Sequence, residues 1–442
     1  MTLIDTGPHR HSAVRMEMLA VAEAALAAVH PEEAIARAAI RDDDTIRIGA
    51  RRIDLGSHDR AVVLGFGKAA VAMGRAALRL LDGIPTVGVL VPTSDGTVDG
   101  LEVITGSHPV PDERSLRGGQ RVLELARSVG PDDLAVVLVS GGGSSVLAAP
   151  AGDLILDDLS TTNALLLRSG ATITELNTVR KHLSAVKGGR LAEALAGAKT
   201  IVTLILSDVI GNPLDVVASG PTVPDPTTFA DALAVLDRYD LRSEVSSAVL
   251  RHLEDGLAGL IPDTPDSNEV FDHQMLVIVA DAGIAARAAC DAARHHPGPS
   301  HVVATDLEGE AREVAKSLVL AAAELDSGET LIYAGETTVT VQGNGRGGRN
   351  QELALAASIE LNGRDDVVIL SLGTDGVDGM SPAAGAFADG SAVARGKKLG
   401  LDAANHLRRN DSHPFLTAIG DTVNSGPTGT NVGDLILVRR VS

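Results

Sequence analysis

Short runs of β-branched apolar residues alternate with alanine-rich segments along almost the whole chain. This alternation is typical of an α/β protein with mainly parallel strands. The predicted strands cover residues 61–64, 87–91, 134–139, 200–206, 275–279, 301–304, 330–333 and 366–371. The predicted helices cover residues 13–29, 117–128, 283–295, 308–323 and 350–361.

A stretch rich in glycine and proline, residues 256–268, interrupts this periodicity. The length of 442 residues is enough for two or three domains with buried cores. We therefore predict that the chain divides at this stretch, with an active-site cleft between the two halves.

Composition excludes several classes of protein. The net charge of −20 argues against nucleic acid as a partner, because binding phosphate along a backbone requires a basic surface. A single cysteine, Cys290, excludes an internal disulfide and fits a reducing compartment. Residues 1–5 lack the features of a secretory signal, and the longest uncharged stretch, residues 135–152, is broken by glycines and a proline. We expect a soluble cytoplasmic protein without a membrane partner.

Four predicted strands run into loops of glycine and polar residues, at positions 65–70, 140–145, 207–212 and 373–379. In open α/β sheets, ligands bind beyond the carboxyl ends of the strands. The second loop reads Ser-Gly-Gly-Gly-Ser-Ser and offers successive N–H groups to phosphate oxygens. It lacks the Gly-Lys-Ser/Thr ending of a Walker A loop and the Gly-x-Ser-x-Gly pattern of a nucleophile elbow.

A second glycine loop, residues 345–352, reads Gly-Arg-Gly-Gly-Arg-Asn-Gln-Glu at the start of a predicted helix. Helix N-termini attract anions, and arginine binds carboxylate or phosphate through two parallel hydrogen bonds. We therefore predict an oxyanion site containing Arg346 and Arg349. The alternative is a solvated turn that only caps the helix.

Other basic residues are candidates for neutralising phosphate. Lys68 lies where a predicted strand meets a helix, and Arg180 and Lys181 lie in the basic segment 177–190. A solvated basic helix face is the alternative for that segment. The loop around Lys68 is not a dinucleotide-binding fingerprint, because Ala70 stands where the third glycine is required.

Asp208, Asp375 and Asp378 have the chemistry to bind Mg²⁺, which prefers one or two carboxylates together with waters and phosphates. Any one of them is also a candidate to accept the proton of a substrate hydroxyl. Plain Asp-Gly turns are the alternative for Asp375 and Asp378.

Taken together, these segments resemble the class II glycerate kinases, which carry a C-terminal domain called MOFRL. The matching segments are residues 65–70, 108–113, 140–145, 177–184, 187–190, 207–211, 219–222, 347–352, 373–379 and 430–432. They follow the order of the family and cover nearly the whole chain. Asn212 is a departure, because family members often have aspartate there; we therefore favour Asp208 as a metal ligand.

The resemblance implies ATP- and Mg²⁺-dependent phosphorylation of D-glycerate at its 2-hydroxyl, giving 2-phosphoglycerate. It implies a Rossmann-like domain with a mainly parallel sheet over residues 1–260 and a smaller α/β MOFRL domain over residues 261–442, with the active site in the cleft between them. It also places Lys68 and Arg349 in the active site.

On this basis we assign a role to each candidate residue. The catalytic residues are Lys68, Arg349 and Asp375, with Asp375 as the base. The residues assigned to ATP phosphates are Ser140, Gly141, Gly142, Gly143, Ser144 and Lys181; those assigned to the acid substrate are Arg346, Arg180 and Asn350; and those assigned to Mg²⁺ are Asp208 and Asp378.

Three alternatives to glycerate phosphorylation remain at this stage. Relatives of the family are often labelled hydroxypyruvate reductases, which would require NAD(P)H, but the incomplete dinucleotide fingerprint argues against that activity. A kinase acting on a related hydroxy acid is the second alternative, and a non-catalytic anion-binding protein is the third. A homodimer is left open.

Overall fold

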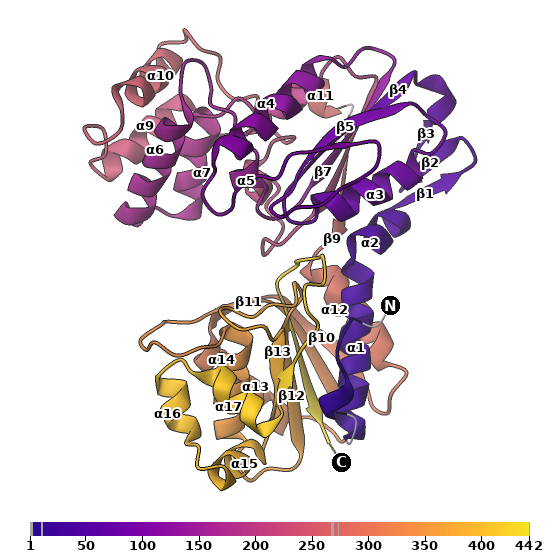
Figure 1. Cartoon of the computed structure of the whole chain (residues 1–442), viewed down its shortest axis with the longest axis vertical. Helices are drawn as coiled ribbons and strands as arrows, with labels where there is room; N and C mark the ends of the chain where they lie inside the picture. Colours follow the sequence, from indigo (N-terminus) through magenta and orange to yellow (C-terminus); the bar gives the residue numbers. More distant parts are fainter. Residues whose placement is uncertain (1–2, 10–11, 267–268, 273, 442) are drawn as a thin grey trace. The chain divides into compact units, whose positions relative to one another are not determined.

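The computed structural model describes residues 3–9, 12–266, 269–272 and 274–441. These residues form two compact units, each built around a six-stranded sheet (Figure 1). The N-terminal unit is Ala34–Val279, and the C-terminal unit combines Met1–Glu33 with Ala280–Ser442. The predicted boundary segment, residues 256–268, precedes this division, and its last two residues lie outside the described ranges, as do Met1 and Thr2.

The sheet of the N-terminal unit is parallel wherever its register is defined. Its strands are β4 (Arg60–Phe66), β5 (Thr86–Val91), β6 (Glu102–Val103), β7 (Asp133–Val139), β8 (Thr200–Leu206) and β9 (Gln274–Ala280). The order is β6-β5-β4-β7-β8-β9, and all neighbours from β6 to β8 are parallel. The chain moves outward from β4 to β6 and then returns to place β7 on the other side of β4. This reversal between β4 and β7 is the switch point at which Rossmann-like sheets bind ligands.

Helices pack on this sheet and also form a separate lobe. Four helices lie beside the sheet: α3 (Ala70–Leu80), α4 (Glu113–Arg127), α5 (Gly143–Val146) and α8 (Arg190–Ala194). Residues of α4 and α8 belong to the buried core of the sheet. Helices α6 (Leu156–Ser169), α7 (Ile173–His182), α9 (Phe229–Arg238) and α10 (Ser247–Leu257) surround a core of their own (Figure 1). Shorter elements are α2 (Pro31–Ala38), α11 (Glu269–Asp272), η2 (Leu55–Ser57) and η3 (Val217–Ser219).

The sheet of the C-terminal unit is mixed. Its strands are β10 (Ser300–Glu310), β11 (Thr330–Thr338), β12 (Val367–Gly373), β13 (Gly385–Asp389), β14 (Thr422–Val423) and β15 (Asp434–Arg440), in the order β10-β11-β15-β12-β13-β14. Strands β10 and β11 are parallel, whereas β15 runs antiparallel between β11 and β12. The carboxyl ends of β11 and β12 therefore lie at one edge of the sheet, where β15 begins.

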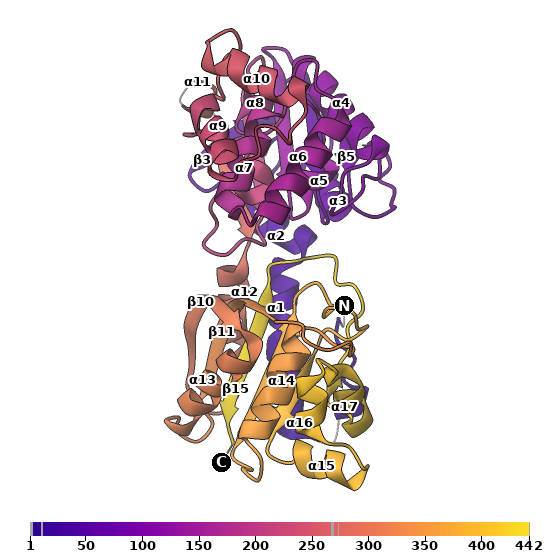
Figure 2. The ribbon, with the colours of Figure 1, turned by 90° about the vertical axis from the view of Figure 1, so that its left-hand side faces the viewer.

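Two layers of helices cover this second sheet. Helices α1 (Ala13–Val29) and α12 (Ala282–Ala293) pack together on one face, and α13 (Ala311–Ala323) and α14 (Arg349–Glu360) pack together on the other (Figures 1 and 2). Helices α15 (Ala392–Lys398), α16 (Ala403–Arg408) and α17 (Ser412–Ile419) lie beside α14, and η1 (Gly7–His9) precedes α1. In the ranges that the structure covers, no helix is both long enough and apolar enough to span a membrane.

The α/β fold and the mainly parallel N-terminal sheet are confirmed. Every predicted strand and helix is present, although residues 308–310 belong to β10 and not to the helix that follows. The small antiparallel sheet of β1 (Ala39–Asp42), β2 (Thr45–Ile48) and β3 (Arg51–Asp54) was not predicted. Charged residues interrupt its apolar pattern, so it does not resemble a buried strand.

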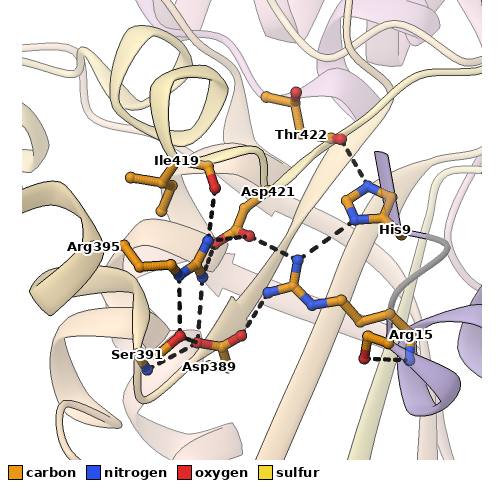
Figure 3. Close-up of polar contacts among 9 residues, drawn as sticks. His9, Arg15, Asp389, Ser391, Arg395, Ile419, Asp421 and Thr422 are labelled. Carbon is orange, nitrogen blue, oxygen red and sulfur yellow. Dashed lines mark hydrogen bonds and ion pairs between the residues drawn. The ribbon is translucent and has the colours of Figure 1, made fainter. Parts of the chain in front are cut away.

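The amino-terminal helix α1 is attached to the C-terminal unit by a buried cluster of charges (Figure 3). Arg15 donates to Asp421 at 2.7 Å and to Asp389 at 2.5 Å. Arg395 also donates to Asp421, at 2.6 Å, and the His9 ring forms a hydrogen bond with the Thr422 carbonyl. The cluster links the first helix to two carboxylates that follow Arg15 by 374 and 406 positions in the sequence.

Replacing Arg15 with methionine should destabilise the C-terminal unit by about 2 kcal/mol, because two largely buried carboxylates would then share Arg395 alone. Burial raises the pKa of Asp389, but hydrogen bonds from Ser391 and the charges of Arg15 and Arg395 lower it to about 2. Because this folded-state pKa is below that of the unfolded chain, the stabilisation is present above about pH 4 and is lost as the pH falls towards 2.

Urea denaturation of the Arg15→Met variant at pH 7 and at acid pH tests this prediction. The exposed Arg408 provides the matched control, Arg408→Met. Equal midpoints for the Arg15→Met variant and the wild type at pH 7 would show that the cluster contributes nothing.

Candidate active site

The loops after β4 and β7 are tied together at the switch point of the N-terminal sheet. The Lys68 N–H donates to the Gly141 carbonyl at 2.8 Å, and the Ala69 N–H donates to Ser140 Oγ at 3.0 Å. Gly67 has a φ of +106°, and a Cβ atom there would lie 2.3 Å from the Ser140 carbonyl oxygen. These contacts hold the backbone of Lys68 against the glycine loop and leave its side chain exposed.

The glycine loop of residues 140–145 presents N–H groups without intramolecular partners. Within the described ranges, the N–H groups of Gly141, Gly142 and Ser144 donate no hydrogen bond. Ser140 has a structural position, because it is fully buried and its Oγ donates to the Phe66 carbonyl. The predicted phosphate site therefore has three available donors, whereas the side chain of Ser140 is directed into the fold.

Two further side chains lie against this loop. Asp208 follows β8, and a Cβ atom on Gly141 would lie 1.8 Å from Asp208 Oδ2. Burial raises the pKa of Asp208, and the charge of Lys68 opposes that shift. Burial lowers the pKa of His108, and Lys68 lowers it further. His108 also lies next to Gly142, at 3.1 Å from a Cβ atom placed there. His108 was not among the predicted site residues, although it begins one of the matching segments.

The Gly141→Ala variant should lose about tenfold in kcat/KM, because the added methyl group must displace the Asp208 carboxylate or the loop. Steady-state kinetics measures this loss. Gly130→Ala is the control, since a Cβ atom there would have one neighbour within 4 Å, Asp133 Oδ2 at 3.9 Å. Wild-type kinetics of the Gly141→Ala variant would exclude this loop from the reaction.

The two adjacent basic residues of α7 have different environments. Lys181 is 2% exposed, and its ammonium pairs with Asp215 at 3.3 Å and Asp225 at 3.2 Å. Arg180 is half-buried and donates to the Ser144 carbonyl at 3.4 Å. Arg180 thus contacts the glycine loop directly, whereas Lys181 is held by carboxylates; the predicted role of Lys181 towards ATP stays a prediction.

In the C-terminal unit, Arg349 is the first residue of α14 and is held by two carboxylates. Its Nε and Nη2 donate to Asp434 at 2.7 and 3.0 Å, and its Nη1 pairs with Glu336 at 2.7 Å. Burial alone would lower the pKa of Arg349, but the hydrogen bonds and charge of Asp434 outweigh burial and raise it. Burial raises the pKa of Asp434, and the bonds from Arg349 act against that change.

Asn350 and Asp378 hold the start of α14 in place. Asp378 accepts the N–H groups of Asn350 at 3.0 Å and Gln351 at 2.9 Å, together with the side-chain amide of Gln351 at 2.8 Å. The Asn350 amide donates to Asp434 at 2.8 Å and accepts from Ser371 at 2.6 Å. Burial raises the pKa of Asp378 despite these donors. The geometry is that of a helix cap, and the predicted roles of Asp378 towards Mg²⁺ and of Asn350 towards substrate stay predictions.

Arg346 and Asp375 lie on loops at the edge where β11 and β12 end. Arg346 is exposed, and its Nε donates to the Met380 carbonyl at 3.1 Å. Asp375 is half-buried and accepts the Val377 N–H at 3.1 Å. Both side chains are therefore more accessible than those of Asn350 and Asp378. Among the described residues, no three His, Cys, Asp or Glu side chains are grouped so that they could hold a metal ion.

Two family models match the chain. Residues 17–254 match the family described as "Domain of unknown function (DUF4147)", and residues 329–434 match the MOFRL family. The D-glycerate 2-kinase of Thermotoga maritima is 40% identical over 389 residues, covering 86% of this chain and 90% of that protein. An Agrobacterium vitis protein provisionally named hydroxypyruvate reductase is also 40% identical, over 85% of this chain and 86% of its own length.

A solved structure agrees with these relatives. The crystal structure of glycerate kinase from Thermotoga maritima superposes with a TM-score of 0.87 at 36% identity, covering 97% of this chain and all of that one (100%). Coverage of this extent includes residues of both units. The chain therefore belongs to the class II glycerate kinase family.

Proposed function

We propose that this protein transfers the terminal phosphoryl group of ATP to the 2-hydroxyl of D-glycerate, giving 2-phosphoglycerate and ADP. A D-glycerate 2-kinase that is 40% identical over 86% of the chain supports the activity. The observation that carries the proposal at the level of residues is the convergence of Lys68, the glycine loop and Asp208 at the switch point of the N-terminal sheet.

Phosphoryl transfer requires positioning and neutralisation of charge more than covalent chemistry. The available N–H groups of Gly141, Gly142 and Ser144 would bind phosphate oxygens of ATP, and Lys68 would neutralise the charge on the transferred group. One carboxylate beside a phosphate site matches the usual ligand set of Mg²⁺, so Asp208 would be its protein ligand. Mg²⁺ bound there would supply positive charge to the phosphates.

The carboxylates of the C-terminal unit differ in burial and in the hydrogen bonds that they already accept, and both decide how readily each can accept a proton. Asp378 and Asp434 are buried and accept several N–H donors each, whereas Asp375 is half-buried and accepts the N–H of Val377. Asp375 is therefore the best candidate to accept the proton of the 2-hydroxyl.

The two arginines of the second glycine loop would bind the transferred phosphoryl group. Three of the five guanidinium N–H groups of Arg349 are engaged by Asp434 and Glu336, which fixes its orientation and leaves two for an anion. Arg346 is exposed, and among the described residues its guanidinium donates to the Met380 carbonyl alone.

Hydroxypyruvate reduction is the competing activity, because a relative that is 40% identical carries that name. A nicotinamide dinucleotide site at β4 would need a third glycine where Ala70 is fully buried at the start of α3. Ala70 carries a methyl group where that motif requires a glycine for close packing of helix and strand. The kinase is therefore favoured.

A coupled assay of ADP release with D-glycerate, L-glycerate, tartronate and a longer aldonate tests the proposal. A parallel reaction contains hydroxypyruvate and NADH without ATP. We expect ADP release that is fastest with D-glycerate and no oxidation of NADH. Oxidation of NADH without any ADP release would overturn the proposed function.

A further inference from the structure

A cavity in the N-terminal unit lies between α5, α6 and α7, next to the glycine loop. Leu159 and Leu166 of α6 contribute apolar lining, and Ser144 belongs to the glycine loop itself. Asn163, Arg180 and Lys187 provide the larger polar groups. The cavity therefore combines apolar walls with positive charge beside the proposed phosphate site.

Neither cation of this cavity is neutralised by a carboxylate. Lys187 is 4% exposed, and its Nζ donates to the Leu147 carbonyl at 2.8 Å. Arg180 donates to the Ser144 carbonyl. Within the described ranges neither side chain forms an ion pair, although the neighbouring Lys181 has two. A buried ammonium group without a counter-ion is costly, so a protein retains it where a ligand supplies the charge.

The electrostatics of the two groups favours binding of an anion. Burial lowers the pKa of Lys187 to about 7, and the positive charge of Arg180 contributes to the shift. Burial also lowers the pKa of Arg180, to about 10. These two are the charged groups among the described residues that line the cavity. An anion between them would restore the ordinary preference of both for the protonated form.

The cavity also contains an acceptor without a donor. Asn163 Oδ1 is buried, and no described residue donates a hydrogen bond to it. Leaving such an atom without a hydrogen bond is unfavourable. A hydroxyl group on a bound molecule would satisfy it.

We propose that this cavity binds the acid substrate of the kinase, with its carboxylate between Arg180 and Lys187 and one hydroxyl donating to Asn163. The inference rests on the proposed function and specifies where the hydroxy acid binds. Lys187 and Asn163 then determine specificity for small acids with a carboxylate near a hydroxyl. The competing occupant with the same charge is a phosphate group of ATP.

Steady-state kinetics of the full-length enzyme separates these occupants. The Lys187→Met and Arg180→Gln variants should each raise KM for D-glycerate by about tenfold or more, with KM for ATP changed less than about twofold. Arg168→Gln is the control, because Arg168 is an exposed residue of α6 outside the cavity. A rise in KM for ATP alone, or no change in either constant, would overturn the assignment.

The pH dependence gives a readout that a purely structural role would not change. Because Lys187 has a pKa near 7 in the free enzyme and a bound carboxylate raises it, binding takes up a proton. The affinity for D-glycerate should therefore weaken as the pH rises above about 7, and the Lys187→Met variant should lose this dependence. An identical pH profile for KM in the wild type and the variant would contradict the proposal.

Thermal denaturation provides a second test in case the Lys187→Met variant is inactive because it does not fold correctly. The buried Lys187 has a folded-state pKa below its unfolded value, so its protonation favours unfolding at neutral pH. The Lys187→Met variant should melt at least about 2 °C higher than the wild type. A lower Tm would mean that Lys187 stabilises the fold and would overturn the proposal. Absence of ADP release in the wild type would instead overturn the proposed function.

Discussion

Replacing Lys68 with methionine should lower kcat/KM by at least about a hundredfold while leaving Tm within about 1 °C of the wild type. Lys68 is exposed, so its side chain contributes little to folding, yet its charge acts on Asp208 and His108 beside the glycine loop. A positive group placed at the transferred phosphoryl is worth most in the transition state. Steady-state kinetics with ATP and D-glycerate, together with thermal denaturation, measures both effects.

The control for Lys68 is Lys199→Met, because Lys199 is another exposed lysine of the same unit, and it donates to the Ser57 carbonyl. The Lys68→Arg variant should recover part of the activity, since the charge remains and its geometry changes. If the Lys68→Met variant kept the wild-type kcat/KM, the N-terminal switch point would have no part in the reaction.

Replacing Asp434 with alanine should lower the free energy of unfolding by about 4 kcal/mol and also reduce kcat. Asp434 is 1% exposed and accepts hydrogen bonds from Arg349 and Asn350. Its removal leaves the Arg349 guanidinium with Glu336 alone and loosens the start of α14. Urea denaturation measures the loss of stability, and kinetics measures the loss of positioning.

Two further variants make the Asp434 prediction specific. Asp365→Ala removes an exposed carboxylate of the same unit and should leave the midpoint unchanged. The double variant Asp434→Ala/Arg349→Met should be less destabilised than the sum of the two single variants, because the unpaired charge is then absent. Additive effects would mean that the pair is not coupled, contrary to its geometry.

The fold could be predicted from the sequence wherever a strand is apolar and is followed by a helix. The runs at residues 61–64 and 134–139 correspond to β4 and β7. Both strands are buried on two faces of a parallel sheet, so their sequences are apolar throughout and easy to recognise. The position of β15 between β11 and β12 could not be predicted, because pairing between distant segments leaves no local pattern. For the same reason, the packing of α1 against α12 could not be predicted.

The loops of the candidate site could be predicted from the sequence. Which of their side chains are held by hydrogen bonds or ion pairs with other residues could not. Arg180 and Lys181 are neighbours in the sequence, and only the structure reveals that Lys181 has Asp215 and Asp225 as partners. Asp375 and Asp378 both precede glycine, yet Asp378 is buried under the start of α14. Lys187 lies within the basic segment 177–190, but its isolation from carboxylates depends on burial that periodicity does not encode.

The position of the phosphate on the product tests the central claim most directly. Two-dimensional proton–phosphorus NMR of the product formed from ATP and D-glycerate identifies the carbon that carries the phosphate. We predict that the phosphorus couples to the single methine proton at carbon 2. Coupling to the two methylene protons at carbon 3, or the absence of any phosphorylated acid, would contradict glycerate 2-kinase activity.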